Sequence, residues 1–310
     1  MAVPPALPPK PPIKLFVKAG VDGASYGACP LSQRIYMILS LKSAIGGYNF
    51  TVYAVNPAKP SDEFKALGLR LVPSISYLQD NLDNLDEILE YIDNNFPKCD
   101  LSYDNILAEK ACKDVFSKFC FFIKAVSKDA FGLTTELEKL DKFLSGKPPG
   151  KGPFMCGSQL TYLDCELLPK LQQIRVAGRD LKGFEIPAAL TGVWNYLKAA
   201  YATDAFRTTC PSDEEITLHW MERTETGLTV GKPQRRKSAL MNATEHRYSF
   251  HTPLDQAVAE ETRVPDSGSY SSAEKKADIE LATTPVVAVD KPEGPTSAPP
   301  LSAPILEAFV

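Results

Sequence analysis

The sequence predicts an α/β domain over residues 13–96, an all-helical domain over residues 103–221 and a disordered C-terminal tail over residues 222–310. Three observations predict this fold class. In the first segment, short apolar runs alternate with amphipathic helical patterns, which is typical of α/β proteins. The second segment carries helical patterns throughout. The tail has nine prolines, no cysteine and no tryptophan, so it cannot bury enough apolar surface to fold.

Composition limits the classes of function. The chain has 310 residues, enough for two domains, and its net charge of −4 gives no general attraction to nucleic acid. We therefore expect no nucleic-acid partner. Residues 1–12 are rich in proline and lack the apolar core of a secretory signal, so we expect a flexible N-terminus. Seven irregularly spaced cysteines without a C-x-x-C pair predict reduced thiols and a cytoplasmic location. The three histidines show no metal-site spacing, so no metal is predicted.

The most informative stretch covers residues 14–42, KLFVKAGVDGASYGACPLSQRIYMILSLK. Its first residues fit a short buried strand, and a glycine-containing loop follows. Apolar residues at helical spacing begin after Pro30. Proline is favoured at the first helical position because its missing N–H had no helix partner to lose. The pattern therefore predicts Cys29 at the N-cap of a helix that begins with Pro30.

This position predicts a reactive thiol. The free N–H groups and the dipole of a helix start favour negative charge, so a thiol there ionises more readily than a free one. Thioredoxin-like folds present a reactive sulfur in this order of strand, loop, Cys-Pro and helix. Ser32 stands where a dithiol enzyme has its second cysteine. Cys29 would therefore work as a monothiol with an outside thiol such as glutathione. The alternative interpretation is a buried structural cysteine beside a helix-starting proline.

Further elements follow from hydrophobic periodicity. Residues 97–102 are predicted to link the two domains. Pro73 falls inside a predicted strand, and proline normally confines a strand to a sheet edge. The predicted strands cover residues 50–55, 71–77 and, weakly, 78–81, and the predicted helices cover residues 85–96, 103–126 and 135–144, with a short helix starting at Ser61.

Two helix starts are marked in the second domain. Thr161 and Asp164 have the spacing of a capping box, and we interpret Asp164 as a structural cap of the helix that follows. Pro169 is expected to bend that helix. Cys210 precedes a proline as Cys29 does, but no strand leads to it. An inert helix-start cysteine is therefore the favoured interpretation, and a redox-active one is the alternative.

The tail contains one short basic patch, at residues 232–237, directly before Ser238. Basic residues before a serine suit a basophilic kinase, so Ser238 is a candidate phosphorylation site. A phosphate there would weaken any attraction of the patch to anionic lipid. Such patches are common by chance, and a patch without function is the favoured interpretation.

Several stretches together resemble one family. The segment FVKAGVDGASYGACPLSQRIYMILSLK is similar to the signature of the chloride intracellular channel family, and LTYLDCELLPKL, KGFEIPAAL and TTCPSDEEI also resemble that family. The resemblance covers residues 13–221 and implies an omega-like glutathione transferase fold with a thioredoxin-like N-terminal domain. The tail lies outside it.

The resemblance implies a glutathione-dependent thiol oxidoreductase. Cys29 would attack a disulfide and, with Pro30, contact glutathione. Pro73 would be a cis-proline facing Cys29, and the backbone of Val72 would pair with the cysteinyl part of glutathione. Asn81, near a helix start, would bind the γ-glutamyl end; the simpler interpretation is a polar loop residue. A conventional conjugating transferase is not implied, because those enzymes mostly use Tyr or Ser where Cys29 stands.

The family is also noted for inserting into membranes and conducting anions. The spanning segment would match residues 29–52, which is a poor span when judged by its polar residues alone. If it inserts, Arg34 and Lys42 are the cationic residues that could attract chloride. Membrane lipids are then conditional partners. The alternative from another class is a non-catalytic scaffold or membrane-trafficking adaptor, with cytoskeletal or scaffold proteins as its partners.

Overall fold

The computed structural model describes residues 11–147, 151–224 and 248–255. Its N-terminal domain alternates strands with helices, which confirms the predicted α/β class. The strands are β1 (Ile13–Lys18), β2 (Phe50–Val55), β3 (Ser74–Tyr77) and β4 (Asp80–Leu82), and the helices are α1 (Pro30–Gly46), α2 (Asp62–Ala66) and α3 (Leu85–Asn95).

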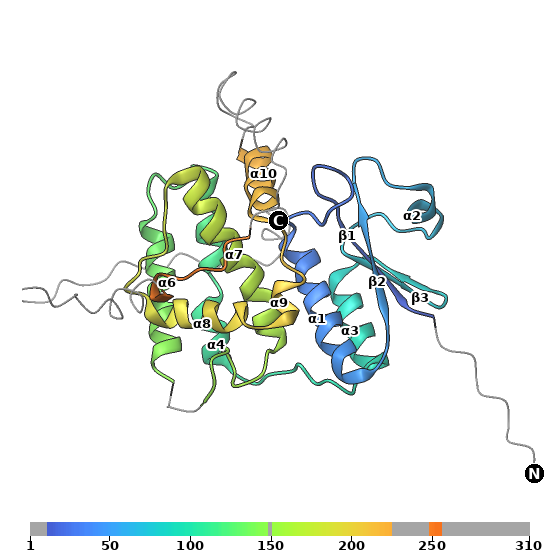
Figure 1. Cartoon of the computed structure of the whole chain (residues 1–310), viewed down its shortest axis with the longest axis horizontal. Helices are drawn as coiled ribbons and strands as arrows, with labels where there is room; N and C mark the ends of the chain where they lie inside the picture. Colours follow the sequence, from blue (N-terminus) through green and yellow to red (C-terminus); the bar gives the residue numbers. More distant parts are fainter. Residues whose placement is uncertain (1–10, 148–150, 225–247, 256–310) are drawn as a thin grey trace, which may run out of the picture.

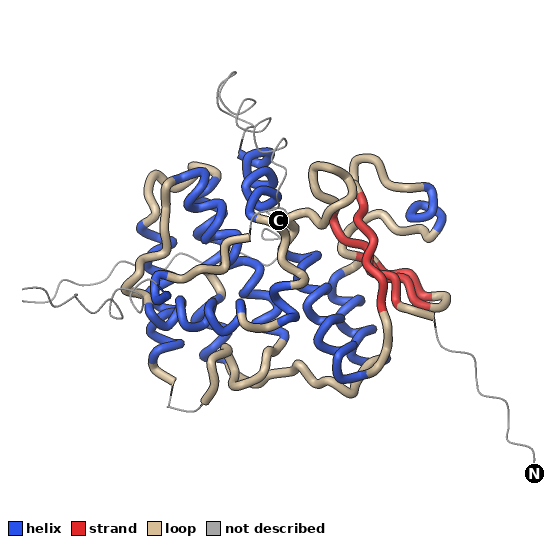
Figure 2. Tube along the Cα trace, in the orientation of Figure 1, coloured by secondary structure: helices blue, strands red, loops and turns tan. Residues whose placement is uncertain are grey.

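The four strands form one mixed sheet in the order β2-β1-β3-β4. β1 runs parallel to β2 and antiparallel to β3, with Leu15 opposite both Val52 and Ile75. Figure 2 shows the strands gathered at one end of the molecule and helices filling the rest. α1 and α3 lie between the sheet and the helical domain, whereas α2 packs on the other face, where Phe64 contacts Phe16 (Figure 1).

The second domain is entirely helical in its described part, as predicted. Helix α7 (Tyr162–Lys182) passes through the centre of this domain (Figure 1). It is buried over most of its length, as its apolar residues at helical spacing require. The helices of this domain are α4 (Ile106–Cys112), α5 (Val115–Ile123), α6 (Phe131–Ser145), α7 (Tyr162–Lys182), α8 (Thr191–Tyr201), α9 (Asp204–Arg207) and α10 (Asp213–Thr224).

Three elements differ from the sequence-based prediction. The helix expected over residues 103–126 is two helices. α4 ends at Cys112, and α5 begins after an N-cap at Asp114. β3 begins at Ser74 rather than at residue 71, since Pro73 offers no N–H to a strand ladder. The weak fourth strand starts later than expected because Leu78 adopts a positive φ of 57° in the turn before it.

Part of the predicted disordered tail is ordered. α10 continues through Thr224, and residues 248–255 pack against the helical domain. Phe250 provides the reason, since its ring packs against those of Tyr201 in α8 and Phe206 in α9. Composition averaged over a long tail does not reveal one aromatic anchor of this kind. Ser238 and its basic patch lie outside the described residues.

Candidate functional site

Cys29 is the N-cap residue of α1, and Pro30 occupies the first helical turn, as the sequence predicts. The backbone of Cys29 is extended, with φ −89° and ψ 114°, and its carbonyl accepts from the N–H of Gln33 at 3.0 Å. The side chain is only 7% exposed. A helix start without a side-chain cap leaves backbone N–H groups available to a neighbouring acceptor.

The loop before Cys29 is held close to the end of β1. Gly27 donates its N–H to the carbonyl of Lys18 at 2.7 Å, and Tyr26 bridges to Ala19. A Cβ on Gly27 would lie 2.4 Å from the carbonyl oxygen of Ala19, so only glycine fits this approach. The loop therefore fixes the position at which the chain enters α1.

The helical domain braces the same loop from the other side. The carbonyl of Ala28 accepts from Nε2 of Gln173 on α7 at 3.1 Å. Oε1 of Gln173 in turn accepts from Nε1 of Trp220 on α10 at 2.6 Å. Glu215 of α10 accepts from the N–H of Val21 at 3.2 Å. Cys29 thus lies at the junction of the two domains, with its approach set by both.

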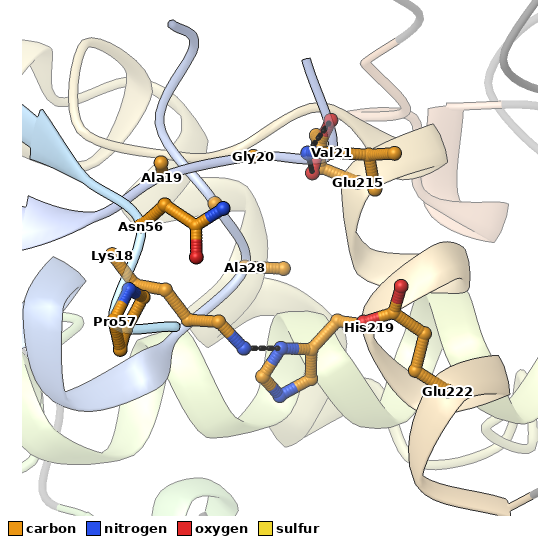
Figure 3. A pocket seen from close by; sticks show the side chains of 11 residues that line it. Lys18, Ala19, Gly20, Val21, Ala28, Asn56, Pro57, Glu215, His219 and Glu222 are labelled. Atoms are coloured by element: carbon orange, nitrogen blue, oxygen red, sulfur yellow. Dashed lines mark hydrogen bonds between the residues drawn. The ribbon is translucent and has the colours of Figure 1, made fainter. Parts of the chain in front are cut away.

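A polar cavity of about 240 Å³ opens beside this junction. Figure 3 shows its two walls, with Lys18, Ala28 and Asn56 from the N-terminal domain and His219 and Glu222 from α10. The cavity adjoins the backbone that leads into Cys29. A substrate that reaches the sulfur from this side would meet polar side chains of both domains.

Two basic side chains of the cavity wall, Lys18 and His219, meet a third, Arg223, behind it. Nζ of Lys18 lies 3.4 Å and Nη1 of Arg223 lies 3.2 Å from Nδ1 of His219. Lysine and arginine offer only donors, so Nδ1 of His219 accepts and the ring proton sits on Nε2. Burial lowers the pKa of His219 well below its usual value, and Arg223 and Lys18 lower it further. The imidazole is therefore neutral.

Cys29 belongs to the same electrostatic environment. Burial lowers the pKa of Lys18, Arg223 lowers it further, and the Cys29 sulfur opposes both effects. The Cys29 sulfur likewise raises the pKa of Arg223, which burial lowers. Two cations therefore lie within electrostatic range of the sulfur. Sequence analysis missed Lys18, His219 and Arg223, because no local pattern joins β1 to a helix about 200 residues later.

The residues expected to bind glutathione lie on two parts of the sheet. The Val72–Pro73 peptide bond is cis. Because Phe16 pairs with Ser74, Pro73 lies at the end of the sheet where β1 leads toward Cys29. Asn81 instead sits within β4, exposed and opposite Ser76.

The start of α3 is occupied by another asparagine. Asn84 is its N-cap, and its side chain accepts from the N–H groups of Asp86 and Glu87. The neighbouring Asp83 accepts from the N–H groups of Arg70 and Leu71 at 2.8 and 3.2 Å. The sequence carried a usable signal, since asparagine before an acidic first turn is typical of an N-cap.

The two cations considered for anion conduction are engaged in ion pairs. Arg34 lies 3.1 Å from Glu166 of α7. Lys42 is 1% exposed and donates to Asp93 at 2.8 Å and to the carbonyls of Phe96 and Cys99. In this conformation both side chains stabilise contacts of α1 with its neighbours. No helix in the described part of the chain has the length and hydropathy to cross a membrane.

Thr161 and Asp164 form the predicted capping box at the start of α7. Asp164 is fully buried, and its carboxylate accepts from the N–H and the hydroxyl of Thr161 at 2.9 and 2.7 Å. It also accepts from the N–H of Met155 and the hydroxyl of Tyr196. Asp164 thus joins three segments of the helical domain, which is more than a cap alone requires.

The other six cysteines are buried or half-buried. All seven are free thiols. Burial raises the pKa of Cys99, Cys112, Cys120, Cys156, Cys165 and Cys210, which favours their protonated form. Cys210 is 4% exposed, and Asp213 raises its pKa further. Within the described ranges no cluster of His, Cys, Asp and Glu side chains has the arrangement of a metal site.

Comparisons with known proteins agree with this architecture. The family model for the CLIC-like N-terminal domain matches residues 11–97, and the model for the glutathione S-transferase C-terminal domain matches residues 132–199. Among solved structures, the CLIC homologue EXC-4 from Caenorhabditis elegans superposes with a TM-score of 0.68 at 26% identity, covering 82% of this chain and 98% of that one. Dehydroascorbate reductase from Chlamydomonas reinhardtii shares the fold, with a TM-score of 0.59 at 22% identity over 68% of this chain and 98% of that one.

The predicted glutathione transferase fold is therefore confirmed. In sequence, the chain is 37% identical over 221 residues to the chloride intracellular channel exl-1 from C. elegans, which covers 70% of this chain and 90% of that protein. The long matching stretch and the shared two-domain fold together establish that this chain belongs to the chloride intracellular channel family.

Proposed function

We propose that this protein catalyses glutathione-dependent thiol–disulfide exchange through Cys29. The single observation that carries the proposal is the place of Cys29, uncapped at the start of α1 and within electrostatic range of Lys18 and Arg223. The nucleophile of such exchange is a thiolate, and reactive cysteines are commonly found at helix starts and beside cations. The absence of a local second cysteine in the Cys29-Pro30-Leu31-Ser32 motif supports a monothiol route.

The proposed reaction has two exchanges. The Cys29 thiolate attacks the glutathione sulfur of a mixed disulfide, forming a Cys29–glutathione disulfide while the substrate leaves as a thiolate and takes a proton from solvent. A second glutathione thiolate then attacks that disulfide, releasing glutathione disulfide and restoring the Cys29 thiolate. Per turnover one free glutathione is consumed, the substrate leaves as a thiol, and the glutathione disulfide holds the substrate's glutathione and the added one. Glutathione would contact Cys29 and Pro30, the Val72 backbone beside Pro73, and Asn81 or the neighbouring Asn84.

The test is reduction of a small glutathione mixed disulfide, with turnover followed by coupled oxidation of a nicotinamide cofactor by glutathione reductase. Cys29→Ser should lower turnover to the uncatalysed rate. Cys210→Ser is the matched control, because Cys210 also precedes a proline near a helix start, and it should keep wild-type turnover. Equal loss in both variants, or no turnover in the wild type, contradicts the proposal and favours a non-catalytic scaffold or trafficking adaptor.

A membrane form that conducts chloride is the second part of the proposal, supported by the name of the C. elegans relative. It requires α1 to leave its present partners, because Arg34 and Lys42 are paired with Glu166 and Asp93. The test is chloride release from vesicles of neutral and anionic lipid, comparing wild type with Arg34→Gln. Slower chloride release with the variant supports a role for Arg34. An unchanged rate of chloride release argues against that role, and the lack of release from vesicles of either lipid contradicts the channel proposal.

A further inference from the structure

Residues 248–255, orange-red in Figure 1, lie on the helical domain although their flanking segments fall outside the described chain. Asp213, the first residue of α10, accepts from the N–H of Ser249 at 3.1 Å and also from its hydroxyl. Nη2 of Arg175 on α7 donates to the same hydroxyl at 2.9 Å. Ser249 thus joins the tail to two helices of the core.

One aromatic side chain anchors the segment. The ring of Phe250 lies 5.1 Å from the ring of Tyr201 and 6.3 Å from that of Phe206, measured between centroids. Lys198 of α8 adds an ion pair with Asp255 at 2.6 Å, between side chains that are 52% and 42% exposed. The docking therefore depends mainly on one aromatic side chain and a few polar bonds, so its free energy is small compared with that of a domain core.

Thr252 lies at the centre of these polar bonds. It is 2% exposed, and its N–H and hydroxyl both donate to Oδ2 of Asp255 at 3.0 Å. The bond from Lys198, together with those from Thr252, lowers the pKa of Asp255 to about 2. The hydroxyl of Thr252 thus faces a carboxylate that is ionised at neutral pH.

We propose that Thr252 is a phosphorylation site for a kinase that requires proline directly after the acceptor, and that the phosphate releases residues 248–255 from the helical domain. Pro253 provides that proline. In the reaction, Oγ1 of Thr252 forms a bond to the γ-phosphorus of ATP. The bond from that phosphorus to the bridging oxygen breaks, ADP leaves, and the hydroxyl proton passes to the base of the kinase.

Charge and volume both oppose docking of the phosphorylated segment. The phosphate would add about −1.5 to −2 charges directly beside the carboxylate of Asp255. Lys198 already pairs with that carboxylate, and Arg175 donates to Ser249 and to the carbonyl of His251. A side chain that is 2% exposed also leaves no space for a phosphate group. The modified segment therefore has to leave its site.

The same burial sets the order of events. A kinase reaches the hydroxyl only when the segment is undocked, so the rate of phosphorylation follows the undocked population. The phosphate then prevents return. Substitutions that weaken docking from different sides should accelerate phosphorylation. Phe250→Ala removes the anchor from the tail, and Lys198→Ala removes its half-exposed ion-pair partner from the helical domain. We expect little effect of Lys198→Ala on the fold, because exposed substitutions of this kind cost little stability.

The experiment treats the full chain with ATP and a proline-directed kinase in a Thr284→Ala background. This background is used because Thr252-Pro253 and Thr284-Pro285 are the two Thr-Pro pairs of the sequence, which has no Ser-Pro pair. Mass spectrometry locates the phosphate, and amide hydrogen exchange measures docking. We expect phosphate on Thr252, faster exchange in residues 248–255, unchanged exchange in α7, and severalfold faster phosphorylation of Phe250→Ala and Lys198→Ala.

Two results overturn the proposal. One is the lack of phosphate on Thr252 in the wild type and in both variants. The other is a phosphorylated segment whose amide exchange equals that of the unmodified protein, which would mean that Lys198 accommodates the phosphate in the docked state. Thr252→Val is the control without an acceptor, and it should incorporate no phosphate.

Discussion

Lys42 and Asp93 form an ion pair of 2.8 Å between a lysine that is 1% exposed and an aspartate that is 49% exposed. The ammonium also donates to the carbonyls of Phe96 and Cys99, at 3.2 and 2.9 Å. Asp93 accepts a further bond from the hydroxyl of Tyr162 at the start of α7. This one cation therefore ties α1 to the end of α3, to the linker and, through Asp93, to the helical domain.

Replacing Lys42 should destabilise this fold. Lys42→Met keeps the aliphatic volume but leaves the carbonyls of Phe96 and Cys99 and the carboxylate of Asp93 without this donor, so we expect a loss of about 2–4 kcal/mol in the free energy of unfolding. Urea denaturation measures it. Lys65→Met is the control, because Lys65 is 58% exposed and pairs only with exposed Asp62, and its effect should stay within about 0.5 kcal/mol. Equal effects of the two variants would show that Lys42 is not a structural cation.

Asp164 should contribute more to the free energy of unfolding than a helix cap does. Thr161→Ala removes the hydroxyl of the cap and should cost about 0.5–2 kcal/mol. Asp164→Ala also removes the acceptor of Met155 N–H and Tyr196 O–H, so we expect a loss of at least about 3 kcal/mol. Thermal and urea unfolding of both variants provide the comparison. If the loss for Asp164→Ala is no larger than that for Thr161→Ala, Asp164 stabilises the protein only as a helix cap.

His219 should make stability depend on pH below neutrality. Its folded pKa lies well below the usual value because the ring is buried and faces Arg223 and Lys18. The unfolded chain binds a proton at His219 near pH 6.5 and the folded chain does not. The contribution of His219 to the free energy of unfolding is therefore fully present above that pH and decreases as the pH falls below it.

The maximum slope from this one group is about 1.4 kcal/mol per pH unit. His219→Gln cannot titrate, so its unfolding free energy should change less than that of the wild type between pH 7 and pH 5. The measurement is urea denaturation across this range for both proteins. Parallel curves for the two proteins would mean that His219 protonates without cost in the folded state.

Gly27 should be the most sensitive residue of the loop before Cys29. Gly27→Ala places a Cβ 2.4 Å from a backbone oxygen, so the loop must shift, at a cost of about 1–3 kcal/mol. Gly23→Ala, in the same loop, meets no atom within 4 Å and only strains a φ of 74°. We expect the rate of Cys29 alkylation, followed by peptide mass spectrometry, to change severalfold in Gly27→Ala and little in Gly23→Ala. The reverse order of sensitivity would contradict the close approach.

Local patterns predicted the elements that depend on neighbouring residues. Pro30 after Cys29 marked the start of α1, and Thr161 with Asp164 marked the start of α7, because caps join residues within one turn. The same kind of signal was present at Asn84, directly before the helix predicted from residue 85, but the asparagine near this helix start was predicted to be Asn81. The break between α4 and α5 carried no comparable signal, since the apolar spacing continues across it.

By itself, the sequence determined the α/β and all-helical domains, the N-cap position of Cys29 and the family. Only the tertiary structure decided what surrounds Cys29, because Lys18 and His219 are 201 positions apart and meet where α10, packed on α7, reaches the end of β1. It also decided that Arg34 and Lys42 are paired and that Phe250 docks part of the tail. Such contacts depend on how whole surfaces pack, and no periodicity or spacing within one segment records that.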